Sequence, residues 1–309
     1  MSDARPQRQR LGFVGLGNIG GVLCANLLTD GHELVVHDVD PVRVEALAGQ
    51  GARAAESPAA VAGQSELTFL SLPSPSVMES VTRQWLEGAQ GGARGGKVLV
   101  DLSTNAPATV QQMGAVVSDA GSSLVEAPLT GGAPGARSRQ LVFIVGGDDE
   151  VVAKVTPLLL SLGRAVFHLG PLGSGNVGKL VNSLMAFATQ WVSLEGMALA
   201  AKNGIDLRTL VEMIRTSGAA TSYLDRRVEQ ITERGRPAEF ALELAAKDAG
   251  LMVEAGRQAG APMPVASALL QVLSDGLAQG LGGRDLSDLV EVAERAAAVE
   301  LRLGPPAGA

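Results

Sequence analysis

The chain has 309 residues, of which 46% are hydrophobic and 3% aromatic, and its formal net charge at pH 7 is -7. This length allows two domains with a sizeable core, and the hydrophobic content excludes a disordered chain. Because proteins bind nucleic acid mainly by neutralising its phosphates, an acidic chain without a long basic run argues against a nucleic-acid partner.

Cysteine usage and the pattern of apolar segments indicate the cytoplasm. Cys24 is the only cysteine, so no internal disulfide can form. Residues 1–10 are polar and lack the apolar core of a signal peptide. The longest apolar region, residues 180–201, contains polar residues, which is typical of a buried helix rather than a membrane span. We therefore expect a cytoplasmic protein without a membrane partner. The histidines and the cysteine have no metal-ligand spacing, so we expect no metal site.

Short apolar runs alternate with helical segments in the first half of the chain. The expected strands are 11–14, 34–36, 67–72, 98–102, 124–126, 141–145 and 165–169, with helices that include 20–29, 41–48 and 106–120. Strands that alternate with helices form βαβ units, and strands covered on both faces read as continuous apolar runs. The pattern predicts a Rossmann-like, doubly wound and mainly parallel sheet.

A glycine-rich turn separates the first expected strand from the first helix. Its residues are Gly15, Leu16, Gly17, Asn18, Ile19 and Gly20. In such a turn Gly15 permits the bend, Gly17 lets the backbone approach a pyrophosphate, and Gly20 allows close helix packing. Asp38 ends the second strand 18 residues later, near the position where an acid binds the 2′-hydroxyl of NAD. We predict NAD as the cofactor; Arg43, which could reach a 2′-phosphate, leaves NADP as the alternative.

The strand pattern ends near Gly170, and the rest of the chain is expected to be helical. We predict a dinucleotide-binding domain over residues 10–171 and an all-α domain for substrate binding and dimerisation over residues 172–309. The second domain starts with a long interdomain helix that runs to about Lys202. Because this helix is apolar on most sides, we expect it to form the centre of a homodimer or homotetramer.

Lys179 and Asn182 lie three residues apart on this long apolar helix, so they share one face. An ordinary surface lysine near a helix start is the simplest interpretation of Lys179. A lysine on a buried apolar helix is costly, however, and burial lowers the pKa of a lysine because it disfavours the charged form. We predict that neutral Lys179 accepts a substrate proton and that Asn182 orients the same oxygen.

Six motifs in chain order resemble those of the β-hydroxyacid dehydrogenase family. This family includes 3-hydroxyisobutyrate dehydrogenase and tartronate semialdehyde reductase and is related to 6-phosphogluconate dehydrogenase. The resemblance covers residues 11–298. The motifs are the turn 15–20, Leu72-Pro73-Ser74-Pro75, Val100-Asp101-Leu102-Ser103-Thr104, Glu126-Ala127-Pro128-Leu129-Thr130-Gly131-Gly132, the helix start from Gly175 to Asn182, and Phe240 to Asp248.

The resemblance implies a role for each matching residue. Cofactor-binding residues are then Leu72, Pro73, Ser103, Thr104 and Lys247, and substrate-binding residues are Thr130, Gly131, Gly132 and Ser183. The Thr130 hydroxyl and the two glycine N–H groups would bind a substrate carboxylate.

The chain departs from the family at three positions. Thr130 stands where the family has serine, Glu126 where it has aspartate, and Ser183 where several members have a second asparagine. Thr130 keeps a hydroxyl, but its methyl group narrows the pocket. We expect Thr130 and Ser183 to determine which acid fits.

Taken together, these residues predict an NAD-dependent 3-hydroxyacid dehydrogenase or semialdehyde reductase that acts on a small hydroxycarboxylate or semialdehyde. Lys179 is its expected general acid and base. An imine reductase shares the fold but usually lacks the lysine, and a 6-phosphogluconate enzyme has a histidine where this chain has Asn182. A non-catalytic NAD(P)-binding scaffold protein is the alternative from a different class, and the presence of Lys179 argues against it.

Overall fold

The computed structural model describes residues 8–89 and 96–304 of the chain. The chain forms two compact units, Met1–Lys179 and Leu180–Ala309. Our boundary between residues 171 and 172 stays a prediction. Among the described residues, no helix is long and apolar enough to span a bilayer.

The first unit contains a six-stranded sheet in which all neighbouring strands are parallel. Its strands are β1 (Arg10–Val14), β2 (Glu33–His37), β3 (Arg53–Ala54), β4 (Leu67–Leu70), β5 (Val98–Asp101) and β6 (Ser123–Glu126). Their order is β3-β2-β1-β4-β5-β6. The order reverses between β1 and β4, and open sheets of this kind bind ligands at the carboxyl ends of the strands beside such a reversal. The predicted doubly wound parallel sheet is confirmed.

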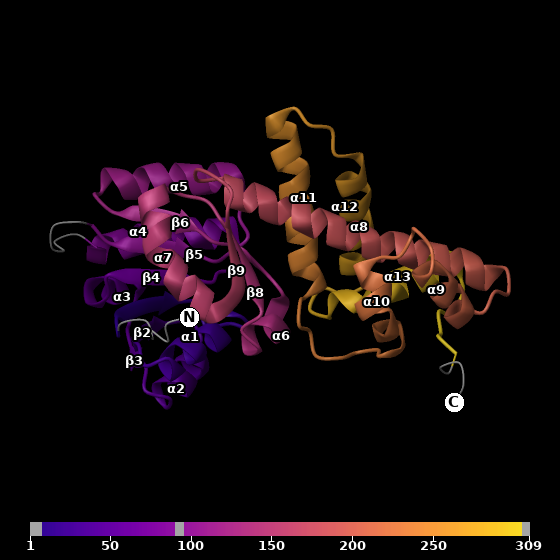
Figure 1. Cartoon of the computed structure of the whole chain (residues 1–309), viewed down its shortest axis with the longest axis horizontal. Helices are drawn as coiled ribbons and strands as arrows, with labels where there is room; N and C mark the ends of the chain where they lie inside the picture. The colour runs from indigo at the N-terminus through magenta and orange to yellow at the C-terminus, as the bar shows by residue number, and fades with distance from the viewer. Residues whose placement is uncertain (1–7, 90–95, 305–309) are drawn as a thin grey trace. The chain divides into compact units, whose positions relative to one another are not determined.

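Helices cover both faces of this sheet (Figure 1). They are α1 (Gly20–Thr29), α2 (Pro41–Ala48), α3 (Pro58–Gln64), α4 (Pro75–Ala89), α5 (Pro107–Asp119), α6 (Gly132–Arg137) and α7 (Asp149–Leu162). Alternate side chains of β1 point to opposite faces: Phe13 packs in a core with α1, α2 and α7, and Val14 in a core with α3, α4 and α5. Trp85 of α4 is fully buried in the second core and donates its Nε1–H to Thr68 Oγ1 at 2.9 Å.

Two expected strands do not join the main sheet. A separate sheet consists of β7 (Leu129–Thr130), β8 (Leu141–Val145) and β9 (Gly163–His168), with β7 antiparallel and β9 parallel to β8. The runs 141–145 and 165–169 are apolar like the others, so their sequence does not reveal which strand they pair with. A single antiparallel bridge between Glu126 and Gly146 connects the ends of β6 and β8.

The second unit is helical, as predicted. The chain enters it along α8 (Ser174–Lys202) and continues through α9 (Leu207–Arg215), α10 (Ser222–Arg226), α11 (Leu242–Ala259), α12 (Pro264–Ala278) and α13 (Leu289–Ala297). Short 3-10 turns form at Val228–Thr232 and Leu286–Asp288. Leu194 of α8 is fully buried in one core with side chains of α11, α12 and α13, and Trp191 packs against that core.

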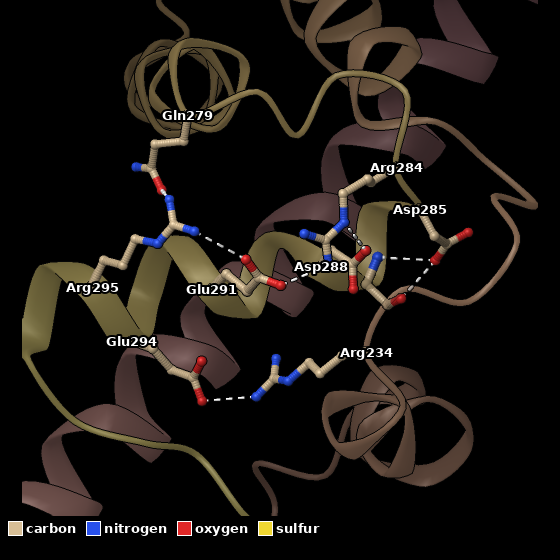
Figure 2. Close-up of polar contacts among 9 residues, drawn as sticks. Arg234, Gln279, Arg284, Asp285, Asp288, Glu291, Glu294 and Arg295 are labelled. Atoms are coloured by element: carbon tan, nitrogen blue, oxygen red, sulfur yellow. Dashed lines mark hydrogen bonds and ion pairs between the residues drawn. The ribbon is translucent and has the colours of Figure 1, made fainter.

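Charged side chains tie the C-terminal segments of this unit together (Figure 2). Arg284 bonds both Asp288 (2.7 Å) and Glu291 (2.6 Å). Glu291 also accepts a hydrogen bond from Arg295, at 3.2 Å. Asp285 Oδ1 accepts from the Ser287 N–H and hydroxyl, at 3.0 and 2.7 Å. These contacts hold the 284–288 turn against α13.

Candidate functional site

The glycine turn follows β1 and is packed tightly on the side that faces the protein. Gly15 has φ +92°, and its N–H donates to His37 O at 3.0 Å. A Cβ at Gly15 would lie 2.3 Å from Ser71 O, and one at Gly20 would lie 2.0 Å from Gly15 O. A Cβ at Gly17 would meet only Arg43 Nη1, at 3.6 Å. The turn is therefore closed behind and open at Gly17, which fits a pyrophosphate at the N-terminus of α1.

Asp38 follows β2 and is held beside this turn. Its Oδ2 accepts the Leu16 N–H at 2.6 Å, and its Oδ1 accepts the Asp40 N–H at 2.8 Å. A carboxylate has about four acceptor positions, so Asp38 can still accept ribose hydroxyls. Arg43 Nη1 lies 3.9 Å from Asp38 Oδ2, and Arg43 Nε lies 3.2 Å from Asp40 Oδ2. Asp38, which we predict to favour NAD over NADP, thus has a guanidinium group as its neighbour.

The loops after β4 and β5 meet at the same edge of the sheet. The Leu72 N–H donates to Ser103 Oγ at 2.8 Å, and the Ser103 N–H donates to Asp101 Oδ1 at 3.0 Å. Ser103 is buried, Leu72 and Thr104 are half-buried, and Pro73 is exposed. The structure therefore places these four predicted cofactor residues beside the reversal in strand order.

Two carboxylates that the sequence analysis assigned no role lie at the ends of β5 and β6. Asp101 and Glu126 are register partners, and both are fully buried. Burial raises the pKa of Asp101 to about 6 and also raises the pKa of Glu126. An acidic residue at the end of an apolar strand was the signal that could have identified them. Within residues 8–89 and 96–304, no group of His, Cys, Asp and Glu is arranged to hold a metal ion.

The buried Asp101 gives the protein an unusual dependence of stability on pH. Its folded pKa, about 6, exceeds the ordinary value of 3.8, so the folded state binds this proton more tightly than the unfolded chain. The contribution of Asp101 to the free energy of unfolding should therefore fall as pH rises from about 4 to 6 and stay constant above that. At about 1.4 kcal/mol for each unit of pKa, the fall is about 3 kcal/mol at most.

Urea unfolding of the wild type and of Asp101→Asn at a series of pH values from about 4 to 8 tests this expectation. The variant lacks the titrating group, so the difference between the two proteins should change across this range and then level off. Two parallel curves would contradict the assignment.

Thr130, Gly131 and Gly132 connect β7 to α6. Gly131 has φ +120° and Gly132 has φ +60°, so both occupy backbone conformations that side chains rarely adopt. A Cβ at Gly131 would also lie 3.2 Å from Leu141 Cδ2. Gly131 is exposed, whereas Thr130 and Gly132 are half-buried. A hydroxyl-bearing residue thus directly precedes two glycines in this turn, and their contact with a substrate stays a prediction.

Lys179 lies in the second turn of α8, with Asn182 one turn further along. We expected Lys179 to be buried, but the structure shows that Lys179 and Asn182 are both half-buried. The helix surface beside Lys179 is open, because Val177 and Val181 are 48% and 51% exposed. Ser183 is buried, at 2% exposure.

Lys247 lies on α11 of the second unit. Its Nζ is 3.0 Å from Asp248 Oδ1, and Asp248 is buried. Asp285 holds the segment that leads into this helix, because its Oδ2 accepts the N–H groups of Glu239 and Phe240 at 2.8 and 3.3 Å. The role of Lys247 at the cofactor stays a prediction.

Comparisons with known proteins match both halves of the chain to family models. Residues 10–170 match the NAD binding domain of 6-phosphogluconate dehydrogenase, and residues 173–293 match the NAD-binding domain of NADP-dependent 3-hydroxyisobutyrate dehydrogenase.

Individual relatives agree with these models. The chain is 32% identical to 2-(hydroxymethyl)glutarate dehydrogenase of Eubacterium barkeri, over 96% of this chain and 98% of the relative. It is 36% identical to 3-hydroxyisobutyrate dehydrogenase of Pseudomonas aeruginosa, over 70% and 72%. The solved 3-hydroxyisobutyrate dehydrogenase of Mycobacterium tuberculosis has the same fold, with a TM-score of 0.84, 24% identity and coverage of 92% and 99%. The chain therefore belongs to the β-hydroxyacid dehydrogenase family and is an NAD(P)-dependent oxidoreductase acting on CH–OH groups.

Proposed function

We propose that this oxidoreductase is an NAD-dependent 3-hydroxyacid dehydrogenase, or a semialdehyde reductase in the reverse direction, with Lys179 as general acid and base. The observation that carries the proposal is the hydrogen bond from the Asn105 N–H to Asn176 Oδ1, at 2.7 Å. It joins the residue after Ser103 and Thr104 to α8, one turn before Lys179. The helix that carries the lysine is thereby tied to the loop after β5, which contains two of the proposed cofactor-binding residues.

Oxidising an alcohol requires a hydride acceptor and a proton acceptor. Bound NAD supplies the hydride acceptor. In its neutral form Lys179 Nζ takes the hydroxyl proton, and in the reduction its ammonium form returns the proton to the oxygen. The Asn182 amide donates a hydrogen bond to the same oxygen and orients it.

The substrate in this proposal is a small 3-hydroxycarboxylate. The Thr130 hydroxyl and the N–H groups of Gly131 and Gly132 bind its carboxylate, and Ser183 is a further proposed substrate-binding residue. The two named relatives are both dehydrogenases of a hydroxy acid, which supports this substrate class.

Our remaining site assignments belong to the same proposal. Residues 10–171 bind the dinucleotide, residues 172–309 bind substrate and form the oligomer, and the protein is cytoplasmic. The proposed cofactor-binding residues are Gly15, Leu16, Gly17, Asn18, Ile19, Gly20, Asp38, Leu72, Pro73, Ser103, Thr104 and Lys247.

A panel of hydroxyacids, semialdehydes and cyclic imines, assayed by nicotinamide absorbance with NAD(H) and NADP(H) at matched concentrations, tests the function. We expect turnover of at least one small 3-hydroxycarboxylate, faster with NAD⁺ because the Asp38 carboxylate repels a 2′-phosphate. Turnover of imines alone would support the imine reductase alternative, and cofactor binding without any turnover would support the scaffold alternative. A preference for NADP⁺ would contradict the role given to Asp38.

An apolar stripe on α8 predicts self-association. Val181, Met185, Val192 and Leu199 are 51%, 67%, 60% and 69% exposed. Their spacings of four and seven residues place them on one side of the helix. Fully burying an exposed side chain of this kind contributes about 1.5–3 kcal/mol, and each of these partly exposed side chains contributes a fraction of that.

We therefore expect a homodimer or homotetramer in light scattering, and a monomer for the double variant Met185→Glu, Val192→Glu. The control Val42→Glu changes an exposed valine of α2 and should keep the wild-type mass. A monomeric wild type would refute the prediction.

A further inference from the structure

Glu126 stands where the family has aspartate, and it contacts the start of α8. The hydrogen bonds to its carboxylate are Gly173 N–H to Oε1 (2.5 Å), Gly175 N–H to Oε1 (2.9 Å), Asn176 N–H to Oε2 (3.1 Å) and Asn176 Nδ2–H to Oε2 (2.5 Å). Because a carboxylate has about four acceptor positions, these bonds saturate it. Glu126 therefore has no acceptor position left for a substrate, although it opens a motif that resembles a substrate-binding element.

Two glycines make room for this longer acid. A Cβ at Gly146 would lie 2.3 Å from Glu126 Oε1, and a Cβ at Gly175 would lie 3.1 Å from Glu126 Cδ. The carboxylate is fully buried, and it lies where the first N–H groups of a helix have no partners within the helix. A negative charge at this end also interacts favourably with the helix dipole.

The hydrogen bonds continue from Asn176 to the loop after β5. Asn176 Oδ1 accepts the Asn105 N–H at 2.7 Å, and Asn105 Nδ2–H donates to Asp101 Oδ2 at 2.6 Å. Asp101 in turn accepts the Ser103 N–H at 3.0 Å. Glu126, Asn176, Asn105 and Asp101 are all fully buried, so each of these bonds is shielded from water.

We infer that Glu126 is a positioning residue, which fixes the first turn of α8 and so places Lys179 against the loop of Ser103 and Thr104. Asn176 lies three residues before Lys179, so the two share a face of the helix. The inference rests on the proposed catalytic role of Lys179. In this inference Glu126 acts through the helix and never touches the substrate.

Glu126→Gln keeps the size of the side chain but turns an NH₂ group toward N–H donors, so one pair of hydrogen bonds is lost. We expect kcat for hydroxyacid oxidation to fall by about 10- to 100-fold, since a misplacement near 1 Å can cost that much. KM for NAD should change by less than about 3-fold, because the glycine turn and Asp38 are untouched. Glu126→Asp keeps the charge and should recover part of kcat.

Thr68→Val is the matched control. Thr68 is fully buried in β4 of the same unit and accepts the Trp85 Nε1–H. Loss of the Thr68 hydroxyl should lower the melting temperature and leave kcat unchanged. The inference is overturned if kcat of Glu126→Gln stays within about 2-fold of wild type, or if Thr68→Val loses as much kcat.

Asn176→Ala decides the question if Glu126→Gln does not fold. It keeps the three backbone bonds to Glu126 and removes the link to Asn105. We expect about a 10-fold loss of kcat, again with KM for NAD within about 3-fold, and an unchanged kcat would count against the inference.

Two readouts do not depend on turnover. In Glu126→Gln, and not in Thr68→Val, amide hydrogen exchange over residues 175–178 should accelerate at least about 10-fold. Acylation of Lys179 at fixed pH, mapped by mass spectrometry, should change rate, while the exposed Lys154 stays constant. If the wild type oxidises no hydroxyacid, the proposed function fails and these readouts still decide the inference. If both readouts match wild type, the positioning role fails while wild-type kinetics still decide the function.

Discussion

Replacing Lys179 with alanine should lower kcat for hydroxyacid oxidation by roughly 10²- to 10⁴-fold, the usual contribution of a general acid or base. In the proposed reaction Lys179, which lies on α8 one turn after the buried Asn176, is the proton acceptor. The affinity for NAD should change by no more than about 3-fold, because the glycine turn and Asp38 remain intact.

Two further substitutions sharpen this test. Lys179→Arg should be as inactive as the alanine variant, because a guanidinium does not give up its proton at working pH. Lys202→Ala removes a lysine from the other end of the same helix, where Nζ donates to Ala298 O, and should keep wild-type kcat. Titration calorimetry gives the NAD affinity of each variant. Turnover that persists in Lys179→Ala would remove the lysine from the mechanism.

Replacing Gly15 with alanine should weaken NAD binding by roughly 100-fold or more, which corresponds to about 2.7 kcal/mol. The new methyl group would lie 2.3 Å from Ser71 O, so the turn must move away from β4. That movement displaces the Leu16 N–H from Asp38 and opens the close packing against Gly20.

Gly31→Ala separates this clash from backbone strain. Gly31 has φ +91°, almost the same as Gly15, but a Cβ there meets nothing within 4 Å. Both variants carry the cost of a left-handed residue, about 1–2 kcal/mol. Gly31→Ala should therefore lose some thermal stability and bind NAD normally. Equal NAD affinities in the two variants would show that the close approach at Gly15 does not matter.

Gly17→Ala covers the case in which Gly15→Ala does not fold. Its methyl group would face the open side of the turn and meet only Arg43. We expect it to fold and still to bind NAD more weakly, because the added group occupies the space proposed for the pyrophosphate.

The main sheet could be predicted because its strands are buried on both faces and therefore apolar throughout. The strand β3 could not, since Arg53 and Ala54 are both exposed and carry no apolar signal. The apolar pattern also does not predict which strands pair. The runs of β8 and β9 resemble those of the main sheet, yet these two strands form a second sheet with β7.

The candidate site was predictable where each residue has a local reason for its type. Gly15 and Gly20 follow from a tight strand–turn–helix connection, and Asp38 follows from its place at the end of the second strand. Glu126 also ends a strand, which marks it as a candidate, but its partners lie about fifty residues further along the chain. The sequence therefore does not reveal that its carboxylate faces the start of a helix.

The two tryptophans are divided between the two compact units. Trp85 is sealed in the core of the first unit, and Trp191 lies partly buried on α8 in the second. The indole fluorescence of Trp85→Phe therefore reports the second unit alone, and that of Trp191→Phe reports the first. Denaturation followed in these two variants would reveal whether the units unfold together or one after the other, without any added label.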